Sequence, residues 1–201
     1  RKVFFLAGPI RGGGNWQMRA AEKLWGKFPG CIVADPSRWD AAEKNAKTDE
    51  EKIKIQEHRK NAIGTKDENL YPAQAPWESD HMKMASENGT LFFWLEKQSI
   101  NDPRPQGEGV YAQDTRVEMG IWIERLHNNP NLKVKIGGNW ELDENGRETE
   151  NSFGGMNFIT FYLTGEKDRR KIYKGEIENE HLILASSLEE FLEIYSDKEK
   201  N

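Results

Sequence analysis

The 201 residues suit one domain, and the 10% of aromatic residues supply enough large side chains for a folded core, which excludes global disorder. The 29 basic and 34 acidic residues are interspersed and give a net charge of −5, which argues against binding to long nucleic acid. The single cysteine excludes an internal disulfide framework and favours a cytoplasmic setting, and no apolar run approaches the ~18 residues of a membrane-spanning helix.

Strands and helices are expected to alternate along the first two thirds of the chain. Apolar runs predict short strands over residues 2–7, 31–34, 90–95 and 133–136. Apolar residues at helical spacing predict helices over 16–28, 77–87 and 115–127, and a charged stretch predicts a mostly solvated helix over 41–62. This alternation indicates an α/β fold with a parallel sheet covered by helices on both faces.

The last third of the chain is less regular. Residues 137–155 are polar and rich in turn formers, and they are expected to form a hairpin or an excursion. Strand candidates follow at 157–163, 172–173 and 181–184, and a final helix over 187–195 is opened by a Ser187-x-x-Glu190 capping box. We therefore expect one domain over 1–201, with its core in 2–136 and a less defined C-terminal part in 137–201.

Ligands of parallel sheets bind outside the carboxyl ends of the strands, where the strand order reverses. This rule directs attention to the loops 8–15, 35–40 and 96–114. The first of them begins Gly8-Pro9-Ile10-Arg11 and continues with three glycines, so a ligand could approach its backbone and an anion could meet the amides of the following helix. The alternative is a tight strand-to-helix turn with no ligand.

A carboxylate on the apolar face of the helix 77–87 is a second candidate. Trp77, Asp80, His81 and Met84 fall at helical spacing, which places Asp80 on an apolar stripe, whereas Glu78 lies off this face and is expected to be solvated. Because a buried charge needs a partner or a pocket, Asp80 is a functional candidate. A structural hydrogen bond from a loop amide is the alternative. Trp77 could stack on a base or pack in the core.

The third candidate is Glu118, near the start of the helix 115–127. At the carboxyl edge of the sheet its carboxylate could attack an anomeric carbon or hold a ribose hydroxyl. The alternative is structural, because Thr115-x-x-Glu118 is a capping-box pattern and Asp114 is a suitable N-cap. The four histidines are scattered and show no metal-ligand spacing, so neither a metal nor a cofactor is expected.

Six short segments of the sequence, taken in their order along the chain, carry a resemblance to a known family. They are Val3–Ile10, Asn15–Trp16, Asp35–Ser37, Trp77–Asp80, Leu91–Trp94 and Arg116–Gly120. As an ordered set over residues 2–126, they resemble the nucleoside 2-deoxyribosyltransferase-like family, in its broader, poorly characterised branch. The resemblance implies a flavodoxin-like fold with a parallel sheet of about five strands. It also implies cleavage of an N-glycosidic bond through a covalent glycosyl–enzyme intermediate, as a transferase or as a hydrolase.

The resemblance also implies residue roles. The nucleophilic Glu of the family's E-x-G motif maps onto Glu118, its proton-handling Asp maps onto Asp80, and Gly8 to Ile10 would line the sugar and base pocket. Where the transferases often carry an Asp, this chain has Ala112, and Asp114 would have to substitute for that Asp. Related nucleotide hydrolases receive a 5′-phosphate on Ser-Gly-Thr, where this chain has Gln113-Asp114-Thr115. Asp114 would repel phosphate, and Arg11 or Arg116 would have to compensate.

The expected partner is therefore a small molecule, namely a nucleoside, a deoxynucleoside or a nucleotide. Two other functions stay open: a non-catalytic module that binds or senses nucleotides, suggested by Ala112, and a glycohydrolase of the NAD type, suggested by analogy of fold alone. Members of the family tend to form homodimers or larger homo-oligomers in which a neighbour completes the pocket, and the same is expected here.

Overall fold

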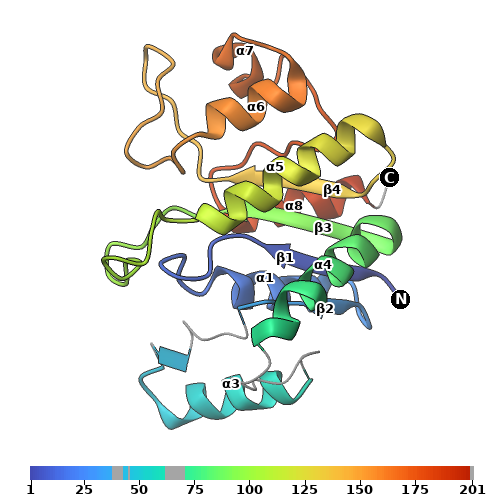
Figure 1. The fold of residues 1–201 in the computed structure, drawn as a ribbon, viewed down its shortest axis with the longest axis vertical. Coiled ribbons are helices and arrows are strands. Elements are labelled where there is room, and N and C mark those ends of the chain that lie inside the picture. Colours follow the sequence, from blue (N-terminus) through green and yellow to red (C-terminus); the bar gives the residue numbers. More distant parts are fainter. Residues whose placement is uncertain (38–42, 45, 62–70, 200–201) are drawn as a thin grey trace.

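A parallel β-sheet forms the centre of the molecule in the computed structural model (Figure 1). The structure describes residues 1–37, 43–44, 46–61 and 71–199, apart from the side chains of 58–61, 71–73 and 169. The strands follow the order β2-β1-β3-β4 and comprise β1 (Val3–Ala7), β2 (Ile32–Ala34), β3 (Gly89–Leu95) and β4 (Val134–Gly138). All neighbouring pairs are parallel, which confirms the expected doubly wound, flavodoxin-like α/β fold.

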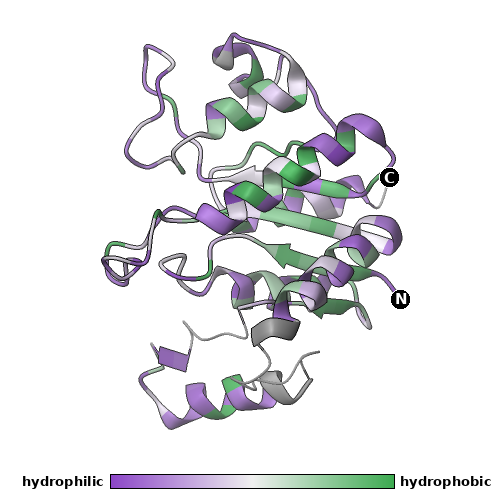
Figure 2. Ribbon diagram, in the orientation of Figure 1, coloured by the Kyte–Doolittle hydropathy of each residue, from purple (hydrophilic) through white to green (hydrophobic). Residues whose placement is uncertain are grey.

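Helices cover both faces of this sheet (Figure 1). One layer contains α1 (Trp16–Lys27) and α8 (Leu188–Lys198), and the other contains α4 (Tyr71–Asn88) and α5 (Gln113–Asn128). Successive strand residues face opposite layers, so Phe4 packs in the first and Phe5 in the second. Every residue of β1 and β3 is buried, which explains why these strands are apolar almost throughout instead of alternating (Figure 2).

The charged helix α3 (Asp49–Asn61) lies beside the first layer and is hydrophilic along most of its length (Figure 2). Its Ile55 is buried against the core, and its Lys54 forms an ion pair of 2.5 Å with Glu22 of α1. Residues 41, 42, 45 and 62 of the expected helix 41–62 lie outside the described residues. In the described part of the chain, no helix combines the length and the apolar character needed to cross a membrane.

The short strand expected at 181–184 is reduced to a single bridge at the outer edge of β4. Leu182 pairs with Ile136 in parallel, through hydrogen bonds of 2.7 Å from Ile136 N to the carbonyl of His181 and of 3.0 Å from Ile183 N to the carbonyl of Ile136. The chain then leaves the sheet to reach Ser187, the N-cap of α8. The described sheet therefore has four strands instead of about five.

Two other strand predictions are wrong. Residues 157–163 belong to the helix α6 (Met156–Thr164), and Ile172–Tyr173 ends the short helix α7 (Arg169–Tyr173). The aromatic and β-branched residues of 157–163 favour a strand, but the segment 181–183 already occupies the edge of β4. Met156, Ile159 and Thr160 instead bury one side of a helix, at helical spacing.

The strand order reverses between β1 and β3, because β1 is followed by a strand on one side and, later in the chain, by β3 on the other. Ligands of such sheets bind in the crevice at this reversal, at the carboxyl ends of the strands. The loops that follow β1 and β3 therefore frame the candidate site.

Candidate active site

The two loops are packed against each other at the carboxyl edge. Ser99 donates its backbone N–H to the carbonyl of Gly12 at 2.7 Å. A Cβ atom on Gly12 would lie 2.8 Å from the backbone nitrogen of Arg104 and 3.2 Å from the ring of Tyr111. Position 12 in the loop after β1 therefore requires glycine, because the loop after β3 packs directly against it.

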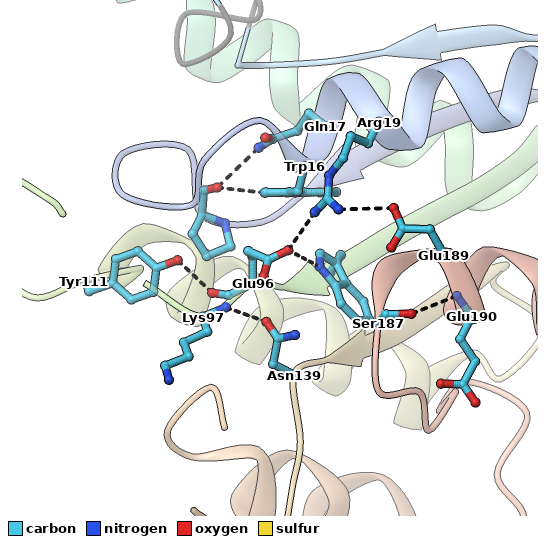
Figure 3. Close-up of polar contacts among 12 residues, drawn as sticks. Trp16, Gln17, Arg19, Glu96, Lys97, Tyr111, Asn139, Ser187, Glu189 and Glu190 are labelled. Atoms are coloured by element: carbon cyan, nitrogen blue, oxygen red, sulfur yellow. Dashed lines mark hydrogen bonds and ion pairs between the residues drawn. The ribbon is translucent and has the colours of Figure 1, made fainter. Parts of the chain in front are cut away.

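Gly8 and Pro9 have a structural role in this turn. Gly8 is buried, and a Cβ atom there would lie 2.3 Å from the carbonyl oxygen of Trp94 and 2.5 Å from the indole of Trp16. The carbonyl of Pro9 accepts hydrogen bonds from Trp16 Nε1 at 2.8 Å and from Gln17 Nε2 at 3.3 Å (Figure 3). Both residues therefore fit the tight turn that was the alternative to ligand contact, whereas the next residue, Ile10, is half-buried.

Glu118 lies near the start of α5 and does not belong to a capping box. The helix begins at Gln113, and its N-cap is Ala112, which has a left-handed conformation with φ 58° and makes no side-chain hydrogen bond to the helix. Thr115 is therefore inside the helix, where it is buried, and Asp114 is exposed. The structural alternative for Glu118 is thus wrong, and its half-buried carboxylate is not needed to begin the helix.

The pKa of Glu118 is raised from its ordinary value of 4.5 to about 7. Burial is the main cause, and the negative charges of Glu78 and then of Asp114 contribute further. Near neutral pH this carboxyl group can therefore change its protonation state. Such a shift is typical of functional carboxyl groups, although structural clusters also produce it.

The acid of α4 whose charge acts on Glu118 is Glu78 and not Asp80. Asp80 is exposed, whereas Glu78 is half-buried on the same side of α4 as the buried Met82 and Ala85. Two residues along a helix correspond to a rotation of about 200°, so Asp80 points away from the side on which Glu78 lies. The expectations that Asp80 would be on the buried stripe and that Glu78 would be solvated are both wrong.

The sequence contained a signal for Glu78, because Glu78, Met82 and Ala85 follow the spacing i, i+4, i+7. Trp77 is half-buried, with ring centroids 6.1 Å from Phe5 and 4.3 Å from His81. Trp77 therefore packs over the middle of β1. Among the other tryptophans near the expected loops, Trp16 and Trp94 are fully buried, and Trp39 lies outside the described residues.

The two arginines that were expected to compensate for Asp114 both interact with other groups. Arg11 is exposed and forms an ion pair of 2.7 Å with Glu108. The guanidinium of Arg116 lies 4.3 Å from the ring centroid of Phe153. Burial lowers the pKa of Arg116, and the nearby charge of Glu148 opposes this effect. The structure thus brings Asp114 and Glu118 together but directs Arg116 to a different neighbour.

A polar network that the sequence analysis missed supports the carboxyl edge from the side of α1 and α8 (Figure 3). Glu96, directly after β3, accepts hydrogen bonds from Trp94 Nε1 at 2.9 Å and from Arg19 at 3.4 Å. Arg19 also contacts Glu189, at the start of α8, at 3.1 Å. Burial raises the pKa of Glu96, and its hydrogen bond from Trp94 opposes that effect.

Two further contacts join this network to the neighbouring loops. Tyr111 donates its hydroxyl to the carbonyl of Glu96 at 2.7 Å, and Lys97 donates its backbone N–H to Asn139 Oδ1, which follows β4, at 2.6 Å (Figure 3). The ends of β3 and β4 and the segment before α5 are therefore held together. No motif in the sequence predicts this network, because its residues come from five separate segments of the chain.

Comparisons of the chain with protein-family models, with curated proteins and with solved structures gave no match. Within the described ranges, no group of three or more His, Cys, Asp or Glu side chains is arranged to hold a metal ion.

Proposed function

We propose that this protein cleaves or transfers the N-glycosidic bond of a nucleoside, a deoxynucleoside or a nucleotide, with Glu118 as the nucleophile. The observation that supports this proposal is the position of Glu118, half-buried at the carboxyl edge where the strand order reverses, where the negative charges of Glu78 and Asp114 act on it. The resemblance of the ordered segments to nucleoside 2-deoxyribosyltransferase-like proteins supports the same reaction.

The reaction suits an ionised carboxylate in this position. A glycosidic bond breaks through a transition state in which the anomeric carbon carries positive charge, and a carboxylate on one face of the sugar stabilises that charge and then bonds to the carbon. The resulting glycosyl ester on Glu118 would be resolved by a second base, which gives transfer, or by water, which gives hydrolysis. Because the ionised form attacks, activity is expected to require a pH near or above the pKa of Glu118.

The test uses mixtures of one deoxynucleoside and a different free base, with chromatography of the products over time. Glu118→Ala is expected to abolish base release and base exchange while leaving the melting temperature close to that of the wild type. The matched control is Glu124→Ala, an exposed acid on the same helix. Full activity of Glu118→Ala would remove the proposal.

The same assay separates the other functions. A nucleotide that raises the melting temperature but is not turned over would favour a binding or sensing module. Release of nicotinamide from NAD would favour a dinucleotide glycohydrolase. A sugar adduct on Glu118, detected by mass spectrometry of the digested protein, would exclude the binding module.

We further propose that the protein acts in the cytoplasm and as a homodimer or larger homo-oligomer. The single cysteine and the resemblance support these two proposals, respectively. Light scattering of the purified protein measures the oligomeric state directly, and a monomer at micromolar concentration would contradict the second of them.

A further inference from the structure

We infer that the outer sides of α5 and α6 form one surface through which a second copy of this chain binds. This surface, the α5–α6 face, consists of five exposed apolar residues, namely Val117, Ile121, Phe158, Phe161 and Tyr162. The inference rests on the homo-oligomer proposed above and not on the proposed reaction, because it names the surface that joins the subunits.

Helix α6 belongs to a segment that the sheet does not require. The chain leaves β4 at Gly138 and returns to the outer edge of the same strand at Leu182, which pairs with Ile136. The residues between these two points include α6 and α7, which lie together beyond that edge (Figure 1). The outer side of this segment is therefore available for a contact that the sheet itself does not make.

Both ends of α6 are held against the rest of the protein. At its start, Glu148 accepts the backbone N–H of Gly155 at 3.0 Å, and a Cβ atom on Gly155 would lie 3.0 Å from Nη1 of Arg116 in α5. At its end, the carbonyl of Tyr162 accepts a hydrogen bond from His127 Nε2 of α5 at 3.0 Å. Helix α6 thus lies along α5 (Figure 1), and a surface fixed in this way loses little conformational entropy when a partner binds.

The buried sides of the two helices determine which residues face outward. One core cluster contains inner residues of both helices, namely Met119, Ile123, Met156 and Ile159. The opposite sides of the helices therefore face solvent next to each other. The α5–α6 face has an aliphatic row on α5, formed by its two aliphatic residues, and an aromatic row on α6, formed by its three aromatic residues.

The size of the α5–α6 face matches the apolar part of a homodimer interface. Its five residues are between 38% and 71% exposed, which amounts to an apolar surface on the order of 500 Å². A standard interface buries about 800 Å² on each partner, and about 65% of a homodimer interface is apolar. One subunit therefore contributes an apolar area close to that of the face. Single exposed apolar residues are common, but a contiguous face with three aromatic rings is typical of an interface.

The two rows complement each other, which favours a second copy over an unrelated partner. In a dimer with a two-fold axis, both subunits use the same surface and each contact occurs twice. An axis that passes between α5 and α6 places the aliphatic row of one subunit opposite the aromatic row of the other. Small side chains then pack against large ones, and none of the five residues takes a charge out of water.

Sedimentation velocity of the full chain over a range of micromolar concentrations tests the inference. The wild type is expected to dimerise, whereas Phe158→Glu on α6 and Ile121→Glu on α5 should each raise the dissociation constant at least ~30-fold, because each buries an unpaired charge. The matched control is Ile53→Glu, which changes an exposed apolar residue on α3 and should leave the dissociation constant unchanged. Since all three positions are exposed, the variants should keep the circular dichroism spectrum of the wild type.

A dissociation constant that neither Phe158→Glu nor Ile121→Glu raises would overturn the inference and leave the proposed homo-oligomer standing. An effect confined to one of the two rows, or an equal effect of Ile53→Glu, would overturn it as well. A wild type that stays monomeric throughout would overturn both the inference and the homo-oligomer, whereas base release from nucleosides judges the proposed reaction separately. Binding of such a monomer to phospholipid vesicles, lost in Phe158→Glu, would assign the face to a membrane surface instead.

Discussion

Arg116 and Glu118 stand two residues apart on α5 and face opposite neighbours. The guanidinium of Arg116 lies over the ring of Phe153, in the segment that follows β4, whereas Glu118 is influenced by Glu78 of α4. Two residues along a helix correspond to a rotation of about 200°, so a single turn of α5 contacts the C-terminal part of the chain on one side and presents a carboxylate on the other.

The raised pKa of Glu118 predicts how stability depends on pH. Between its ordinary value of 4.5 and its folded value of about 7, the folded protein retains a proton that the unfolded chain has released. The free energy of unfolding therefore falls as pH rises through this window, and the loss is complete above about pH 7. Glu118→Gln cannot ionise, so its stability relative to the wild type should rise by about 1 kcal/mol, allowing for partial exposure.

Urea denaturation at pH 4 and at pH 8 measures this difference. Glu124→Gln, which changes an exposed acid on the same helix, is the control and should show no such dependence. A Glu118→Gln variant whose advantage is equal at both pH values would contradict the burial of an ionisable carboxyl group at this position.

The same titration predicts the pH profile of activity. Since the carboxylate form attacks, kcat/KM on a nucleoside should rise with pH through about 7. Removing the charge of Glu78 or of Asp114 lowers the pKa of Glu118, so the rising limb should move to lower pH in Asp114→Asn and further in Glu78→Gln. Initial rates from pH 5 to pH 9 test this, with Asp80→Asn as the variant in which the limb stays in place.

Two glycine substitutions are expected to have opposite effects. In Gly8→Ala the new Cβ would meet the Trp94 carbonyl and the Trp16 indole, and the free energy of unfolding should fall by about 3 kcal/mol. In Gly120→Ala no described atom lies within 4 Å of the new Cβ, and alanine favours the helix, so stability should rise by about 0.5–1 kcal/mol. Thermal melts of both variants measure these changes in stability. A Gly8→Ala variant as stable as the wild type would contradict the predicted steric clash.

Arg116→Ala is expected to loosen the segment 139–155 from α5. The substitution removes the contact with Phe153 and the attraction to Glu148, whose carboxylate accepts the backbone N–H groups of Gly155 and Asn157 at 3.0 and 2.7 Å. The free energy of unfolding should fall by about 1–2 kcal/mol. Hydrogen exchange should accelerate in 139–155, whereas Arg147→Ala, an exposed change in the same segment, should leave it unaffected.

The sequence was informative where burial leaves a regular pattern. The strands β1 and β3 could be located because both of their faces are covered, and α5 because Met119, Trp122 and Leu126 repeat at helical spacing. The segment 157–163 was misassigned because its aromatic residues suggest a strand, although all three, Phe158, Phe161 and Tyr162, lie on the exposed surface. Composition alone cannot distinguish an exposed aromatic residue from a buried one.

The identity of the partly buried acid on α4 was predicted wrongly for a different reason. The assignment of Asp80 depended on counting His81 and Met84 as members of a buried face, yet Met84 is 44% exposed and the buried positions are Met82 and Ala85. A shift of one residue in the assumed face, from positions 77, 80, 81 and 84 to 78, 81, 82 and 85, brings in Glu78 and removes Asp80. The rotational orientation of such a helix is fixed by the sheet beneath it, which the local sequence does not contain.

The bridge between Ile136 and Leu182 also bears on how copies of the chain could associate. An unpaired edge strand can join the edge strand of another molecule and extend one sheet into the next. Here the outer edge of β4 is already engaged by the stretch around Leu182, and the opposite edge, β2, is only Ile32–Ala34. Within the described residues, neither edge of the sheet thus offers a long unpaired strand, so we expect an assembly of this protein to use its helices and loops instead of the sheet edges.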